Sequence, residues 1–257
     1  MKNAVLYICH GSRVKKARDE AVAFIEKCSR QIAVPIQEIC FLELAEPDIS
    51  SGIEACVKQG AEQIAVIPVL LLTAAHAKSD IPEELEKALK KHPDVEISYG
   101  APIGVQGSMA EAVLEQTAPL PADEDVRLLL VGRGSSDPDV KKDLQEIASG
   151  IVKRTEGLAV TVCYLTAAEP AFSEVLKKIG TFRENSVYIV PYLLFTGLLM
   201  KGIEKEIQNL SSEKNIRLCS YVGFSQHTEA AFVKRVREAL NGLQAAEGVS
   251  RYAPFNA

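Results

Sequence analysis

The chain has 257 residues, enough for two domains of ordinary size. Apolar residues make up 47% of it and charged residues 25%, as in soluble globular proteins, and no apolar run approaches the length of a membrane-spanning helix. The formal net charge of −5 argues against nucleic acid as a partner.

The first 118 residues alternate short apolar runs with amphipathic segments. The run 4–9 is typical of a strand buried on both faces, whereas 14–32 has apolar residues at helical spacing. We expect Asp80 to cap a helix, because Pro82 follows within the first turn. The expected order is strand 4–9, helix 14–32, strand 36–42, helix 50–59, strand and exit 63–72, helix 80–91, strand 95–99 and helix 108–116.

The second half repeats this order after a Pro-rich, acidic stretch at 119–125. We therefore expect an N-terminal domain over 1–118, a C-terminal domain over 126–245 and a mobile tail over 246–257. Alternating strands and helices predict an α/β fold, with an open parallel sheet flanked by helices in each domain. The expected elements are strand 127–132, helix 139–154, strand 159–165, helix 172–179, strand 186–192, helix 202–211, strand 216–221 and helix 228–243.

Three separated windows of the two halves align at one offset of 123 residues, which indicates a duplicated fold. The windows are 5–12 with 128–135, 41–47 with 164–170, and 68–78 with 191–201. Within them the second copy loses three polar residues of the first: His10 becomes Arg133, Glu43 becomes Thr166 and His76 becomes Leu199. Both copies keep the scaffold, but only the first keeps these three polar residues. The chemistry is therefore predicted to lie in the N-terminal domain.

His10, Glu43 and His76 each follow the carboxyl end of a predicted strand: the first, second and third strand respectively. In an open parallel sheet of flavodoxin-like order these ends lie at one edge, where ligands bind. Two imidazoles and a carboxylate suit a divalent transition metal that keeps exchangeable positions. The three residues are therefore the candidate metal ligands and catalytic groups.

The surrounding residues suggest an anionic ligand with apolar faces. His10 opens a strand-to-helix turn that adds Ser12 and Arg13, and backbone N–H groups in such turns favour negative charge. The matching turn of the second copy supplies Arg133, Ser135 and Ser136. If a pseudo-twofold axis relates the domains, both turns face one cleft with apolar walls, as a flat macrocycle carrying carboxylates would require. The expected walls are 70–72, 74–75, 193–195 and 198–200.

These motifs resemble those of the class II, CbiX-type tetrapyrrole chelatases over nearly the whole chain. The resemblance rests on the HGSR turn at 10–13, the segment LELAEP at 42–47 and the strand PVLLL at 68–72 that leads to His76. It implies insertion of Fe2+ into sirohydrochlorin, as in the two-domain bacterial members. The sequence contains no G-x-x-x-x-G-K-[ST] motif, so we expect the reaction to be ATP-independent. The family's two central histidines fall on His10 and His76, and its acidic position falls on Glu43.

Two alternatives stay open. Some family members insert Co2+ for cobalamin synthesis, and a non-enzymatic metal or tetrapyrrole carrier would need the same pocket. The resemblance implies sirohydrochlorin and a divalent ion (Fe2+, or alternatively Co2+ or Ni2+) as partners, with no further cofactor, nucleic acid or membrane. Internal duplication replaces a homodimer interface, so we expect a monomer. Six scattered cysteines without a C-x-x-C pair, and no signal peptide, favour the cytoplasm.

Each candidate also has a purely structural interpretation. Ser12 and Ser135 could simply cap helices, and Arg13 and Arg133 could be surface charges. Other enzyme classes fit less well: a histidine phosphatase would need Arg where Cys9 stands, and a cysteine phosphatase would need Arg in place of Lys15. A two-lobed solute-binding protein would need a secretion signal.

Overall fold

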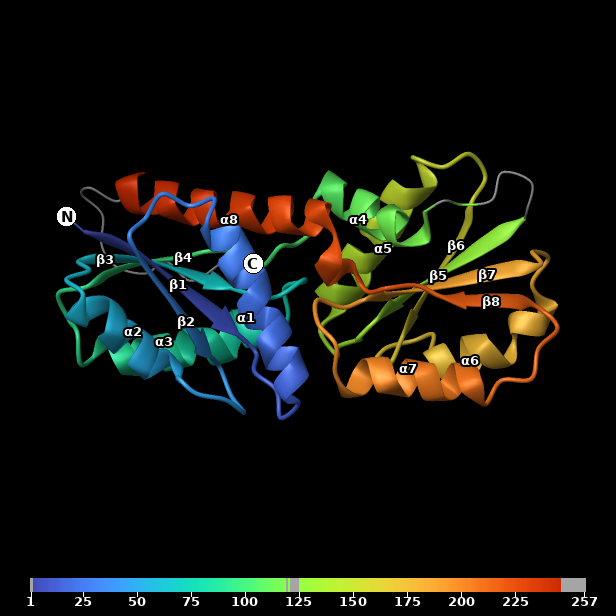
Figure 1. The fold of residues 1–257 in the computed structure, drawn as a ribbon, viewed down its shortest axis with the longest axis horizontal. Helices are drawn as coiled ribbons and strands as arrows, with labels where there is room; N and C mark the ends of the chain where they lie inside the picture. Colours follow the sequence, from blue (N-terminus) through green and yellow to red (C-terminus); the bar gives the residue numbers. More distant parts are fainter. Residues whose placement is uncertain (1, 119, 121–124, 246–257) are drawn as a thin grey trace. The chain divides into compact units, whose positions relative to one another are not determined.

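The computed structural model describes residues 2–118, 120 and 125–245 (Figure 1). They form two compact units. The first contains the described residues up to Gly104 together with those from Glu229, and the second contains Val105–Thr228.

The first unit is built on a four-stranded parallel sheet of order β2-β1-β3-β4. This is the predicted flavodoxin-like order, in which the first and third strands are neighbours. The strands are β1 (Asn3–Cys9), β2 (Ile36–Phe41), β3 (Gln63–Pro68) and β4 (Glu96–Tyr99). Helices of the first repeat are α1 (Lys15–Ser29), α2 (Ile49–Lys58), α3 (Ile81–Leu89) and α4 (Gly107–Thr117), and a π-helix covers His76–Asp80.

Helices cover both faces of this sheet, which is why its strands are apolar throughout. Helices α2 and α3 cover one face (Figure 1). Their apolar side chains join those of β1 and β3 in a continuous core. On the other face, Phe232 of α8 (Gln226–Ala245) lies 6.0 Å from Tyr7 of β1 and 5.3 Å from Phe24 of α1, measured between ring centroids. Such aromatic packing contributes beyond the buried area alone.

The second unit has the same topology, with strand order β6-β5-β7-β8 and all neighbours parallel. Its strands are β5 (Val126–Gly132), β6 (Ala159–Tyr164), β7 (Ser186–Tyr192) and β8 (Asn215–Leu218). Its helices are α5 (Pro138–Val152), α6 (Phe172–Lys177) and α7 (Leu198–Gln208), with 3-10 turns at Ile179–Thr181 and Val222–Phe224. The α/β fold class and the two parallel sheets are therefore confirmed.

The last helix of each repeat belongs to the other compact unit. Helix α4 lies in the second unit and packs on α5 and β7 there, whereas α8 from Glu229 onward lies in the first unit. Lys27 of α1 pairs with Glu229, and the Nε of Arg235 donates to the Pro102 carbonyl at 3.0 Å. The compact units thus differ from the expected domains 1–118 and 126–245, which follow the sequence repeat. The expected tail at 246–257 lies outside the described residues.

Most elements begin and end within two residues of the predicted bounds, but α1, α7 and β8 each end three residues before the predicted end. Two further places differ. Helix α7 begins at Leu198, four residues before the predicted start. The prediction that Asp80 caps a helix is wrong: its backbone is already helical, and its side chain makes no capping hydrogen bond. The chain enters α3 through the π-helix His76–Asp80 instead, and the Asp80 carboxylate contacts a side chain within that turn.

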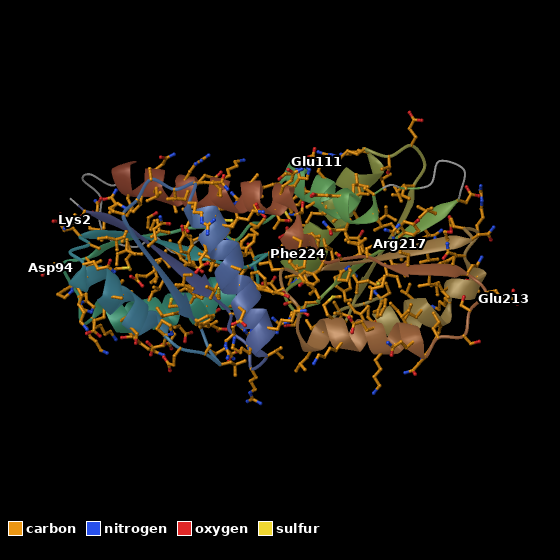
Figure 2. All side chains as sticks on the ribbon, in the orientation of Figure 1. Lys2, Asp94, Glu111, Glu213, Arg217 and Phe224 are labelled. Atoms are coloured by element: carbon orange, nitrogen blue, oxygen red, sulfur yellow. The ribbon has the colours of Figure 1, made fainter. Side chains whose placement is uncertain are left out.

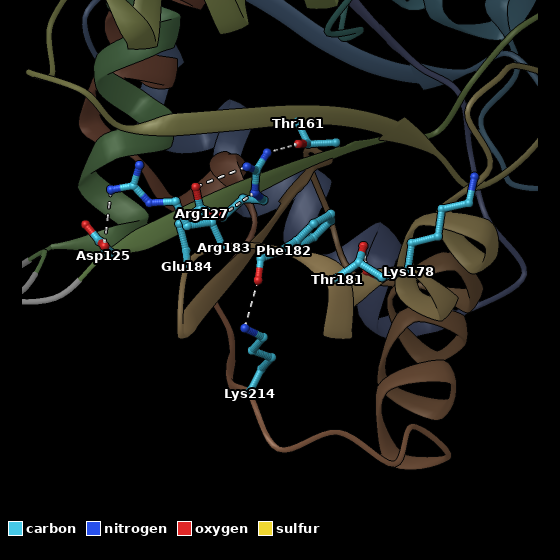
Figure 3. Close-up of polar contacts among 9 residues, drawn as sticks. All are labelled: Asp125, Arg127, Thr161, Lys178, Thr181, Phe182, Arg183, Glu184 and Lys214. Atoms are coloured by element: carbon cyan, nitrogen blue, oxygen red, sulfur yellow. Dashed lines mark hydrogen bonds and ion pairs between the residues drawn. The ribbon is translucent and has the colours of Figure 1, made fainter.

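The two units differ at the amino ends of their central strands. In the second unit, Arg127 at the start of β5 donates two hydrogen bonds to Glu184, from Nε at 2.8 Å and from Nη2 at 3.1 Å (Figure 3). Its Nη1 donates to Thr161, and its guanidinium carbon lies 4.6 Å from the centre of the Phe182 ring. The matching positions of the first unit hold the buried alanines Ala4 and Ala61.

Within the described part of the chain, no helix is long and apolar enough to cross a membrane.

All six cysteines are buried free thiols. Burial raises their pKa values, to about 12 for Cys9, so they are unreactive core residues.

Candidate functional site

Two loops that follow neighbouring strands are fastened together beside His10. The N–H of Glu43 donates to the carbonyl of His10 at 3.1 Å. Gly11 has a φ of 95°, and a Cβ atom there would lie 1.7 Å from the Glu43 carbonyl oxygen. Only glycine allows this approach, and it brings the Glu43 Oε1 atom to 3.5 Å from the His10 Nε2 atom.

Leu44 continues this loop in an unusual conformation. Its φ is 62°, a left-handed value that is costly for a bulky residue, and its side chain is 46% exposed. The matching Ala167 of the second unit has a φ of 49°, so the backbone shape belongs to the loop itself. The exposed leucine is specific to the first unit.

His76 comes from the segment after β3 and stands against His10. The two imidazole rings are 4.5 Å apart between centroids and nearly perpendicular, at 86°. Their side chains are 27% exposed for His10 and 28% for His76, so both are reachable from solvent. The structure therefore brings together the three residues that the sequence places at separate strand ends.

Each imidazole has its Nδ1 atom next to an oxygen. The Nδ1 of His76 is 2.6 Å from Oδ2 of Asp80, and the Nδ1 of His10 is 3.2 Å from the Gly11 carbonyl oxygen. A carbonyl can only accept a hydrogen bond, and an ionised carboxylate likewise only accepts. In neutral His76 the Nδ1 atom therefore carries the proton, and the Nε2 atom carries the lone pair that binds metals. His10 has an acceptor beside each ring nitrogen, the Gly11 carbonyl oxygen at Nδ1 and the Glu43 carboxylate at Nε2.

The arrangement is open rather than a closed cage. Among residues 2–118, 120 and 125–245, no three His, Cys, Asp or Glu side chains are grouped so that they could enclose a metal ion. His10 has both His76 and Glu43 beside it, while the half-exposed Glu43 carboxylate stands 3.5 Å away. The groups present can hold an ion loosely or take up protons.

The expected substrate-binding residues lie on the matching turns of the two units. In the first unit, the Ser12 hydroxyl accepts from the N–H of Val14 at 3.1 Å, and Arg13 is exposed. In the second unit, the Ser135 hydroxyl accepts from the N–H of Asp137 at 3.0 Å. Both serines thus brace their turns but do not cap the helices, because the N-cap positions are Val14 and Asp137. Arg133 and Ser136 are exposed on the second unit.

The second unit repeats the loop architecture without the imidazoles. A Cβ atom at Gly134 would lie 1.8 Å from the carbonyl oxygen of Thr166, and the Thr166 N–H donates to the Arg133 carbonyl at 2.9 Å. Leu199 takes the place of His76.

Of the expected apolar walls, those in the second unit are only partly exposed. Leu193, Leu194 and Met200 are buried in its core, whereas Leu198 is 73% exposed. Phe224, which the sequence analysis did not single out, is 62% exposed, and its ring lies 4.8 Å from that of Tyr221 (Figure 2).

Comparison with known proteins assigns the class. The CbiX family model matches the chain twice, over residues 4–120 and 127–239, so both repeats are covered. A sirohydrochlorin ferrochelatase of Bacillus subtilis is 51% identical over 240 residues, which is 93% of this chain and 92% of that protein. A sirohydrochlorin cobaltochelatase of Priestia megaterium is 33% identical and covers 93% of this chain and 80% of its own.

The fold comparison agrees. The solved structure of SirB from Bacillus subtilis with Fe3+ superposes with a TM-score of 0.87 at 51% identity, covering 95% of this chain and 98% of that one. The protein belongs to the CbiX family of chelatases.

The sequence analysis missed one polar neighbour of the site, Asp80. The available signal was its spacing of four residues from His76, which places both on one face of a helical turn. Pro82, two residues further on, favoured a capping role instead.

Proposed function

We propose that this protein is a sirohydrochlorin ferrochelatase that inserts Fe2+ into sirohydrochlorin without ATP. The observation that carries the proposal is the pair of perpendicular imidazoles, 4.5 Å apart, at the carboxyl edge of the first sheet. It is supported by 51% identity to a sirohydrochlorin ferrochelatase over 93% of the chain. The metal ion is a substrate in this reaction, not a resident cofactor.

His10, His76 and Glu43 are the proposed metal ligands. Two ligands about 2.1 Å from one ion lie roughly 3.0–3.4 Å apart at ordinary bond angles. The 3.5 Å between His10 Nε2 and Glu43 Oε1 is close to this separation, so a small movement would place one ion between them. With few protein ligands, the ion keeps positions that the pyrrole nitrogens can take over.

The same groups are the proposed proton acceptors. Insertion exchanges one divalent cation for two pyrrole N–H protons, so two protons must leave as the metal–nitrogen bonds form. The Nε2 atoms of neutral His10 and His76 and the carboxylate of Glu43 can each accept a proton. A nearby cation keeps imidazoles neutral and so maintains this capacity until the metal has moved into the ring.

Binding of the tetrapyrrole is proposed to use charge and apolar contact. Arg13 and Arg133 would bind its carboxylates through charge-assisted hydrogen bonds, helped by the hydroxyls of Ser12, Ser135 and Ser136. Exposed Leu44, on the loop that carries Glu43, offers apolar surface for the ring. We further propose that the enzyme acts as a monomer in the cytoplasm, where its six free thiols stay reduced.

Insertion of Co2+ is the second candidate, favoured by the 33% identity to a cobaltochelatase. Iron is the preferred assignment, because the ferrochelatase relative is considerably more similar. Competition between equal concentrations of Fe2+ and Co2+ under anaerobic conditions would decide between the two ions.

The test is turnover of sirohydrochlorin with Fe2+, followed by absorbance. We expect many equivalents of product per protein, and loss of turnover in His10→Ala and His76→Ala. His92→Ala is the matched control, since His92 lies in the turn between α3 and β4, outside the site. A single equivalent of product would indicate a carrier, and wild-type turnover in His10→Ala would overturn the site assignment.

A further inference from the structure

The segment that carries His76 has a geometry that helices rarely adopt. Residues His76–Asp80 form a π-helix, in which the N–H of Ile81 donates to the carbonyl of His76, five residues back. Such turns are uncommon and occur frequently at functional sites. The hydroxyl of Tyr99, from β4, donates to the Ala77 carbonyl at 2.9 Å and fastens the turn to the sheet.

The turn sets Asp80 directly against His76. Its Oδ2 atom lies 2.6 Å from the His76 Nδ1 atom, a short distance typical of a charge-assisted hydrogen bond. Because the carboxylate accepts the Nδ1 proton, the Nε2 atom is the one that carries the lone pair. A carboxylate partner of this kind fixes the ring's orientation and tautomer and strengthens the imidazole as a ligand.

The matching segment of the second repeat lacks this histidine–aspartate pair. There the chain forms an ordinary α-helix from Leu198, with Leu199 in place of His76. Asp80 is replaced by Ile203, which is fully buried in the apolar core. Histidine and aspartate are therefore present together in one repeat and absent together in the other.

We infer that Asp80 is a positioning residue, which holds His76 with its Nε2 atom toward the metal. Asp80 itself touches neither the ion nor the tetrapyrrole in this role. The inference rests on the proposed function for the identity of the ion, but the hydrogen bond and its effect on the imidazole can be measured without any chelatase reaction.

The first measurement is the tautomer of His76 in the full-length protein without metal. It is read from 15N chemical shifts of the imidazole, at a pH where the ring is neutral. We expect the Nδ1–H form in the wild type and a shift toward the Nε2–H form in Asp80→Ala. Glu86→Ala, which removes a charge from the exposed side of α3, is the control and should leave the tautomer unchanged.

The second measurement is Co2+ affinity, from the visible absorption of the bound ion. We expect Asp80→Ala to weaken binding about 10- to 100-fold, the usual effect of removing such a carboxylate partner. Asp80→Asn keeps a neutral acceptor and should fall between Asp80→Ala and the wild type. In turnover, the KM for Fe2+ should rise while the KM for sirohydrochlorin stays nearly unchanged.

An unchanged His76 tautomer in Asp80→Ala would overturn the inference, whatever happens to the affinity, and so would wild-type Co2+ affinity. If that variant does not fold, Asp80→Ile is judged by the same two results, since isoleucine occupies the matching helix position of the second repeat. Failure of the proposed function is a separate outcome: the wild type would lack turnover even though its His76 tautomer depended on Asp80.

Discussion

The carboxyl edges of the two sheets have the same backbone and different chemistry. Gly11 and Gly134 permit the same close approach of two loops, and the Glu46 and Glu169 carboxylates accept from the backbone N–H two residues on, at 3.1 and 2.9 Å. What differs is the set of side chains placed on this frame. The comparison separates residues that build the edge, which both repeats keep, from those proposed to act there, which only one keeps.

The largest expected effect is the loss of turnover when both histidines are removed from the first unit, a loss that placing their counterparts in the second unit should not reverse. The double variant His10→Ala/His76→Ala should lose about 10²–10⁴-fold in turnover, the range typical of removed acid–base groups. Adding Arg133→His, Thr166→Glu and Leu199→His should not restore it, because the second unit lacks the π-turn and an aspartate beside residue 199. Recovery to within tenfold of wild type would mean that the backbone frame alone makes the site.

A reciprocal exchange at one position sharpens the comparison. Ile203→Asp should cost about 3–5 kcal/mol of unfolding free energy, because it buries an unpaired carboxylate in the second core. Asp80→Ile should change stability by less than about 1 kcal/mol, because Asp80 is half-exposed. Urea unfolding of both variants measures the difference, and equal losses would contradict it.

The shared glycines offer a test in which both units respond alike in stability but not in activity. Gly11→Ala and Gly134→Ala should each cost about 2–4 kcal/mol, because a Cβ atom would collide with a backbone carbonyl at a positive φ. In the folded fraction, turnover should fall in Gly11→Ala, whose clash displaces Glu43. Gly134→Ala should instead raise the KM for sirohydrochlorin with kcat nearly unchanged, because its turn carries the proposed carboxylate-binding residue Arg133. An equal fall in kcat would mean that the second unit's turn takes part in the chemical step.

The fold could be predicted from the sequence because its signals are local and occur twice. Apolar strands such as 4–9 alternate with helices, and one offset aligns the two copies, so strand order and edge follow from topology. The exchange of α4 and α8 could not be predicted in this way. Both helices present similar apolar faces, and pattern alone does not tell which of two equivalent sheets each will cover.

The site could be predicted only where the duplication reveals polar residues of the first copy that the second copy replaces. His10, Glu43 and His76 stand out because the second copy replaces them. Asp80 is replaced as well, but it stands beyond the aligned window and beside Pro82, where helix capping is the commoner role of aspartate. Its contact with His76 depends on a π-turn, for which the sequence carries no comparably strong signal.

The smallest expected effect concerns the amino edge, where the second unit has an ion pair and the first has alanines. Hydrogen bonds from Arg127 lower the pKa of Glu184, so the pair stabilises the folded state above the ordinary pKa of glutamate, near 4.3. Glu184→Gln should therefore cost about 1.5–3 kcal/mol at pH 7. The difference from wild type should shrink as the pH falls through the lowered pKa, because the wild-type carboxylate is then protonated too.

Urea unfolding at pH 7 and near pH 3 measures this difference, with the exposed Glu174→Gln as the control. An effect of equal size at both pH values would mean that packing of the side chain, not its charge, stabilises the edge. Turnover should be unaffected at pH 7, since the pair lies at the opposite end of the strands from the carboxyl edge. The second unit would then owe part of its stability to an ion pair that the first replaces with apolar packing, while the proposed chemistry lies in the first unit alone.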